Sequence, residues 1–123
     1  MAAPNLLSPT TITGKTVTVN LTTTSATSVL SNAASSGKAL KVNSLYVANT
    51  TATVANITIN QYSAAALGGT AFPIASTIAV PGNATLVVID KDAYVYLEEN
   101  TSLGATAGTS SALQIVCSYE DIS

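Results

Sequence analysis

Four acidic residues in the last third of the chain have the clearest potential for chemistry. Glu98 and Glu99 are adjacent in "YVYLEENTSLGATAG", and Asp90 and Asp92 precede them in "DKDA". Paired carboxylates catalyse glycoside hydrolysis, and carboxylate oxygens bind calcium. The chain has no tryptophan to hold a sugar, and "DKD" lacks the glycine and the twelfth-position glutamate of a calcium loop. The acids therefore indicate a charged strand end rather than a catalytic pair or a metal site.

Strand alternation also separates the two glutamates. If residues 94–98 form a strand, Glu98 shares a face with Tyr94 and Tyr96, whereas Glu99 already belongs to the turn that follows. Neighbouring side chains would then point apart, which is the wrong geometry for a shared proton.

The other groups needed for catalysis are missing or are placed for packing. Histidine is absent, which excludes Ser-His-Asp and Cys-His catalysis and removes the commonest transition-metal ligand. The single cysteine, Cys117, alternates with Leu113, Ile115 and Tyr119, so we expect a buried thiol. Glycines at 68–69 and in "PGN" suit turns rather than phosphate loops. We therefore expect no enzyme activity, no cofactor and no metal.

Charge is scarce and unevenly placed. Charged residues make up 8% of the chain, and the four basic residues are all lysines. Lys15, Lys38 and Lys41 are the only charges before Asp90, whereas all six acids lie in residues 90–121. The two halves could meet head to tail between copies, or the charges could simply be solvated. Without arginine and with a pI of about 4.6, the chain is not expected to bind nucleic acid.

The elements that would position these residues are strands. Hydrophobic residues make up 47% of the chain, and most of the remainder is Thr, Ser, Asn and Gly, which favours an all-β protein. Alternation places Val17, Val19 and Leu21 on one face of the first strand. About eight strands, spaced as in an antiparallel sandwich or barrel, are predicted at 16–22, 28–31, 38–49, 53–62, 71–80, 85–89, 94–98 and 111–120.

Several details of these strands are also predicted. Leu40, Val42 and Tyr46 are expected to face inward together, and residues 85–89, "TLVVI", to form a fully buried strand. Pro73 places its strand at an edge or a bulge. Residues 100–111 are expected to form a loop with a weak strand around Leu103.

The chain is predicted to consist of an N-terminal arm and one domain. Residues 1–12, with Pro4 and Pro9, are expected to form an extended N-terminal arm, and residues 13–123 a single domain. No signal peptide and no membrane-spanning run is recognisable, so we expect synthesis in a cytosol and no membrane contact. The low charge means either that hydroxyls and amides keep the surface hydrated or that much of it is covered, and it suggests a permanent assembly.

Tyrosine suits an interface because its ring is apolar and its tip is polar. Tyr94 and Tyr96 share one strand face and are the best interface candidates among the five tyrosines. Together with the arm and the oppositely charged segments, they give the predicted interface residues Asn5, Leu6, Leu7, Lys38, Lys41, Tyr94, Tyr96, Glu98 and Glu99.

Four segments carry a resemblance that covers most of the chain: "NLLSPTTITGKT", "SNAASSGKALKVNSLYVANT", "YLEENTSL" and "IVCSYEDIS". Together they resemble small virion structural proteins of tailed phages, especially phages of marine bacteria and cyanobacteria. That family often has "LEEGDSL" where this chain has "LEENTSL". Asn100 here replaces the glycine, and asparagine tolerates the left-handed turn conformation.

The resemblance implies a jelly-roll sandwich that decorates or cements a phage head. Its partners would be the major capsid protein and other copies of itself, with a trimer favoured over a dimer. It would then lie on the capsid surface of a virion assembled in the host cytoplasm. The alternatives are a neck, tail or fibre component, or a carbohydrate-binding adhesion module in which Tyr62, Tyr94 or Tyr96 stacks on sugar.

Overall fold

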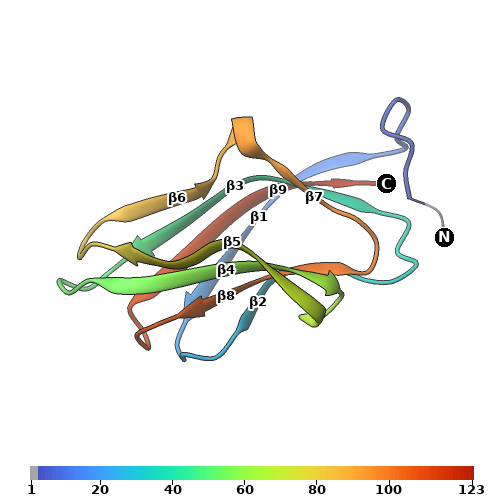
Figure 1. The fold of residues 1–123 in the computed structure, drawn as a ribbon. Helices are drawn as coiled ribbons and strands as arrows, with labels where there is room; N and C mark the ends of the chain where they lie inside the picture. The colour runs from blue at the N-terminus through green and yellow to red at the C-terminus, as the bar shows by residue number, and fades with distance from the viewer. Residues whose placement is uncertain (1–2) are drawn as a thin grey trace.

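The computed structural model describes residues 3–123, which form two antiparallel sheets packed face to face (Figure 1). The all-β sandwich predicted from the sequence is confirmed. The described residues form nine strands and one short 3₁₀ turn, η1: β1 (Ile12–Leu21), β2 (Thr27–Asn32), β3 (Ala39–Asn49), β4 (Ala55–Ala64), β5 (Gly68–Val80), β6 (Thr85–Ile89), η1 (Lys91–Ala93), β7 (Val95–Leu97), β8 (Thr101–Ala107) and β9 (Leu113–Ile122).

The strand order is that of a jelly roll. The five-stranded sheet runs β1-β9-β3-β6, with β7 also pairing with β3, and the four-stranded sheet runs β2-β8-β4-β5. The pairings are nested: β4 pairs with β5, β3 with β6 and β7, β2 with β8, and β1 with β9. The chain therefore resembles one long hairpin rolled into two sheets. This roll places the first, third and last strands side by side.

The core lies between the sheets and follows the predicted alternation in most strands. Leu21 in β1, Ile57 and Ile59 in β4, and Ile115 in β9 are fully buried. Burying each such side chain contributes about 1.5–3 kcal/mol. Cys117 is also buried, on the inward face predicted for it.

The expected inward position of Tyr46 is wrong because of a β-bulge. The register of β3 against β9 shifts between Val42 and Ser44, so one extra residue enters β3. Beyond the bulge, Leu45 and Val47 are buried and Tyr46 points outward with 39% of its surface exposed. An inserted residue reverses the side of every later side chain, which sequence alternation alone does not show.

Two further strand predictions need correction. The segment "TLVVI", expected to be fully buried, is the edge strand β6, and its Val87 is half exposed. The segment expected to be mostly loop contains β8, which lies between β2 and β4. Its residues are small and weakly apolar, yet Leu103, Ala105 and Ala107 are buried. The opposite side of β8 is covered too, since a Cβ atom at Gly104 would lie 2.6 Å from Leu67 Cδ2. Small side chains therefore suit this strand.

The first strand begins at Ile12, four residues before the predicted start. Ile12 pairs with Ile122, and the amides of Thr10 and Thr11 both donate to the carbonyl of Ser123. The described part of the predicted arm is therefore residues 3–11, and residues 1–2 lie outside the described residues. A turn at Asn5 folds this segment, since the amide of Ser8 donates to the Asn5 carbonyl. The expectation of a simply extended arm is thus corrected.

The loops gather at two ends of the sandwich. The loop end comprises loops 22–26, 50–54, 81–84 and 108–112, which are joined by main-chain hydrogen bonds. The terminal end comprises loops 33–38, 65–67 and 98–100, together with residues 3–11 and Ser123. Loop 90–94 instead lies partway along the sheet edge, between β6 and β7, which both pair with β3. A buried asparagine anchors each end. The Asn49 side chain donates to the carbonyls of Thr53 and Val80, and that of Asn32 to those of Lys38 and Leu97.

Candidate interaction surface

The two tyrosines singled out from the sequence are in contact beside a lysine. The rings of Tyr94 and Tyr96 meet edge to face, with their centroids 5.5 Å apart. The Nζ atom of Lys41 lies 4.4 Å from the centroid of the Tyr94 ring, a cation–π distance. This arrangement follows from the pairing of β3 with β7, which sets Lys41 opposite Tyr96. One face of Tyr94 is therefore covered by an ammonium group.

A groove at the terminal end brings four of the predicted residues together. This acidic groove has a volume of about 500 Å³ and is lined by Ala3, Pro4, Leu6, Ala39, Tyr96, Glu98 and Glu99. Leu6 is half exposed at its edge. Within residues 3–123, neither glutamate forms an ion pair. The groove thus combines an apolar wall with two carboxylates.

The strand alternation that was expected to separate Glu98 from Glu99 does not extend to these residues. Strand β7 ends at Leu97, one residue earlier than predicted, so alternation no longer governs the two glutamates. The Glu98 carbonyl accepts a hydrogen bond from Thr101 Oγ1 at 2.7 Å, and Asn100 has a φ of 58°. Both glutamate residues line the same groove after this tight turn. Asn100 adopts the left-handed conformation that the family resemblance led us to expect.

The other two predicted arm residues do not line the groove. Asn5 Oδ1 accepts a hydrogen bond from the amide of Leu7 at 3.0 Å, which stabilises the turn. Leu7 is 95% exposed. A fully solvated leucine has no role in the packing of its own chain, so Leu7 is available for a contact with another molecule.

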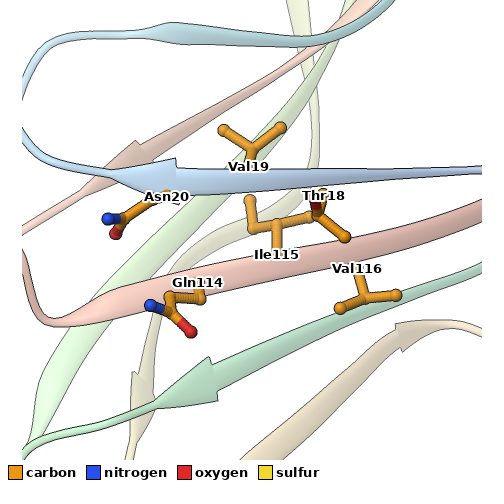
Figure 2. Close-up of a pocket in the computed structure, with 6 residues that line it drawn as sticks. All are labelled: Thr18, Val19, Asn20, Gln114, Ile115 and Val116. Carbon is orange, nitrogen blue, oxygen red and sulfur yellow. The ribbon is translucent and has the colours of Figure 1, made fainter.

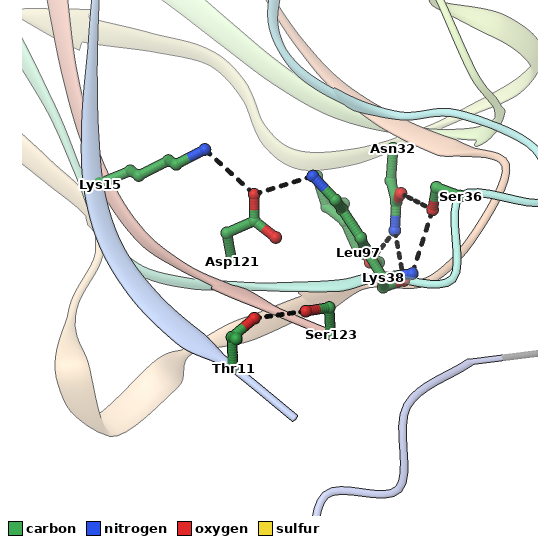
Figure 3. Close-up of polar contacts among 8 residues, drawn as sticks. All are labelled: Thr11, Lys15, Asn32, Ser36, Lys38, Leu97, Asp121 and Ser123. Atoms are coloured by element: carbon green, nitrogen blue, oxygen red, sulfur yellow. Dashed lines mark hydrogen bonds and ion pairs between the residues drawn. The ribbon is translucent and has the colours of Figure 1, made fainter. Parts of the chain in front are cut away.

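Lys38 belongs to an ion cluster at the terminal end (Figure 3). The Asp121 carboxylate lies 3.2 Å from the Nζ atom of Lys15 and 3.3 Å from that of Lys38. Partial burial acts to raise the pKa of Asp121, but the hydrogen bonds and charges of the two lysines outweigh it and hold the pKa below its ordinary value. Because both lysines are nearly half exposed, solvent weakens this attraction.

The opposite charges of the two halves meet within one molecule. Strand β9, which carries Glu120 and Asp121, lies between β1 with Lys15 and β3 with Lys41. The Lys41 Nζ atom is 3.9 Å from Glu120 Oε2. The three early lysines therefore face acids of their own chain, a third arrangement beside the two that were considered, head-to-tail pairing between copies and simple solvation. Sequence alone does not show this, because it requires the strand order.

Other features of the described residues offer little chemistry. A shallow depression of about 330 Å³ on β1 and β9 is lined by hydroxyl, amide and aliphatic side chains without an ionisable group: Thr18, Val19, Asn20, Gln114, Ile115 and Val116 (Figure 2). Burial raises the pKa of the Cys117 thiol to about 11. No cluster of metal-binding side chains occurs among residues 3–123, nor does any helix there have the length and hydrophobicity to cross a membrane.

One exposed apolar surface was not predicted from the sequence. Edge strand β5 exposes three large apolar side chains, Phe72, Ile74 and Ile78. A signal was present, since residues 42–89 contain no charged residue and Pro73 already predicted an edge strand. All four strands of the four-stranded sheet lack charge, and so do all four loops of the loop end.

Comparison with known proteins supports the fold. No protein-family profile matches the chain, and no curated protein matches it. A solved structure described with the words "Bacillus endospore appendages form a novel family of disulfide-linked pili" is similar, with a TM-score of 0.52 and 19% identity. The match covers 92% of this chain and 88% of the other. The chain therefore shares an all-β sandwich fold with a pilus protein.

Proposed function

We propose that this chain is a structural protein of a tailed-phage virion that decorates the head shell and stabilises it through contacts between many subunits. The observation that carries the proposal is the distribution of charge. The whole four-stranded sheet and the whole loop end are free of charged residues, although both reach the molecular surface. A surface of this kind is typical of a protein that is covered in an assembly.

The geometry suits repeated contacts better than catalysis. The jelly roll is a rigid block, and its ion pairs tie the first, third and last strands together at the terminal end. The exposed Leu6 and Leu7 project from the N-terminal segment beside the acidic groove. In the proposed assembly, this segment lies across a neighbouring subunit, and the shell gains stability because each contact favours the folded, assembled state.

A fibre or tail component is the second candidate, favoured by the likeness to a protein that forms pili. Those pili are described as disulfide-linked, and this chain cannot copy such a linkage in its folded state. Its one cysteine, Cys117, is fully buried, and its raised pKa keeps the thiol protonated. A fibre of this chain would have to rely on non-covalent contacts.

A sugar-binding adhesion module has less support from the same residues. Tyr62 is only 9% exposed, and Lys41 covers one face of Tyr94. Stacking on sugar needs an open aromatic face. We therefore rank adhesion behind decoration.

Binding to empty heads tests the proposal. Purified chain would be mixed either with assembled heads that lack it or with unassembled major capsid protein. Co-sedimentation of the chain would be measured in both mixtures. Decoration predicts saturable binding to assembled heads and none to unassembled capsid protein. Absence of binding to heads would refute the decoration role.

A further inference from the structure

Strand β5 exposes apolar side chains that belong to the core side of its sheet. Ile78 lies opposite the fully buried Ile57 in the register of β4 and β5, and antiparallel partners point to the same face. Phe72 lies opposite Gln61, whose partner on the other side is the buried Leu103. Nevertheless, 41% of Ile78 and 58% of Phe72 is exposed.

These side chains lie on an edge strand that is flanked within its sheet by β4 alone. Strand β5 has 13 residues, whereas the corresponding edge of the five-stranded sheet consists of two short strands, β6 with five residues and β7 with three, which both pair with β3 (Figure 1). The exposed fractions show that the other sheet covers the inner side of β5 only in part. An uncovered core face costs free energy in water and favours a partner that completes it. We call the exposed residues Phe72, Ile74 and Ile78 the β5 edge.

Charge indicates which partner fits this surface. A basic membrane-binding or nucleic-acid-binding surface is excluded because β5, its neighbour β4 and the next strand β8 carry no lysine. A charged peptide would find no complementary charge there. The same surface on a second copy is also uncharged, so the two surfaces do not repel each other. Burial of Phe72 between them removes no ion from water.

We propose that copies of this chain associate with one another through the β5 edge. The terminal end is a poor alternative for self-association. Its Glu98 and Glu99 form no ion pair within residues 3–123, so two such ends would repel each other. The neutral β5 edge thus lets subunits meet while the acidic side chains stay in solvent.

The contact is made by side chains rather than by strand addition. Pro73 has no amide hydrogen to donate, and the register of β4 against β5 shifts at three places. Thr77 has a φ of 49°, and its amide donates to Thr58 Oγ1. Bulges and proline are devices that prevent edge-to-edge sheet extension. Association through Phe72 and Ile78 therefore does not extend the β-sheet from one copy into the next.

The inference deepens the proposed function, because a decoration protein that assembles as an oligomer needs such a contact, but its test does not require phage heads. The mass of the purified full chain would be measured by sedimentation equilibrium over a range of concentrations, for wild type and Phe72→Glu. The matched control is Val87→Glu, because Val87 is an apolar residue with 50% exposure on β6, an edge strand of the five-stranded sheet. Val87 also tests a second exposed apolar surface, which it forms with Tyr46 and Val116, because Tyr46 pairs with both valines.

We expect wild type and Val87→Glu to form the same oligomer, and Phe72→Glu to raise the dissociation constant about tenfold or more. A monomeric wild type at all concentrations would overturn the inference, as would equal dissociation of both variants or dissociation of the control alone. If Phe72→Glu fails to fold by circular dichroism, the neutral variant Phe72→Ser replaces it with the same expectation. If the chain binds heads but is a monomer, the inference fails and the proposed function holds. If the chain is an oligomer that does not bind heads, the proposed function fails and the inference holds.

Discussion

At the residue scale, Asp121 holds the terminal end together through its two lysines. The low pKa of Asp121 means that its contribution to stability is present above the unfolded pKa of about 3.9 and is lost as the pH falls through the folded value. Asp121→Asn should therefore lower the free energy of unfolding at pH 7 by about 1 kcal/mol, since the lysines are partly solvated. Denaturant unfolding at neutral and acidic pH measures this difference.

The matched control for that change is Asp92→Asn, because Asp92 is exposed and forms no ion pair within the described chain. The control should stay within about 0.5 kcal/mol of wild type. The deficit of Asp121→Asn should shrink as the pH falls through the folded pKa of Asp121, because the wild-type carboxylate then becomes protonated too. A deficit that persists unchanged in acid would show that the ion pairs are not its cause.

Gly104 provides a steric prediction at the same scale. A Cβ atom at this position would lie 2.6 Å from Leu67 Cδ2 and 3.0 Å from Tyr62 Cε2. Both side chains cover the outer side of β8, so Gly104→Ala should destabilise the fold by about 1–3 kcal/mol. Gly14→Ala is the control, because nothing lies within 4 Å of its Cβ position. Equal unfolding midpoints for the two variants would contradict the packing described for β8.

At the element scale, the strands with strong alternation were predictable and the irregular ones were not. Ala55, Ile57 and Ile59 face the core as the pattern in β4 indicates. The outward position of Tyr46 depends on a bulge, which arises from pairing with β9 and leaves no trace in alternation. Strand β8 was mostly missed because its only large apolar residue is Leu103. Its stability comes from two flanking strands, which are distant in sequence.

The N-terminal segment is the element whose role can be separated from folding. Within residues 3–123, main-chain pairing of this segment with the rest of the domain starts at Thr10, so we expect deletion of residues 1–9 to leave the unfolding midpoint nearly unchanged. The deletion removes Leu6 and Leu7, and we expect weaker occupancy of phage heads. Quantitative binding to heads measures the effect. Unchanged occupancy would show that the segment does not contact a neighbour.

At the scale of the whole molecule, the sequence predicted part of the candidate surface. Leu6, Tyr96, Glu98 and Glu99 were chosen from the sequence and line one groove. The partners of the early lysines could not be foreseen, since they depend on the position of β9 between β1 and β3. The β5 edge was also missed, because exposure of its inner side depends on how the two sheets pack on each other.

The distribution of charge gives the molecule two unlike parts. Acids and lysines occupy the terminal end and the adjoining strands, whereas the loop end and the four-stranded sheet are neutral. In an assembly, burial of the neutral part costs no ion desolvation, and exposure of the charged part keeps the particle soluble. The proposed decoration of a head shell uses both properties.

The copy number of the chain in purified phage particles tests this account most directly. Quantitative mass spectrometry would compare the chain with the major capsid protein in the same particles. Decoration predicts a copy number comparable to that of the shell subunits, and a parallel loss of both when heads are removed from tails. A few copies per particle, or copies that remain with isolated tails, would contradict the central claim.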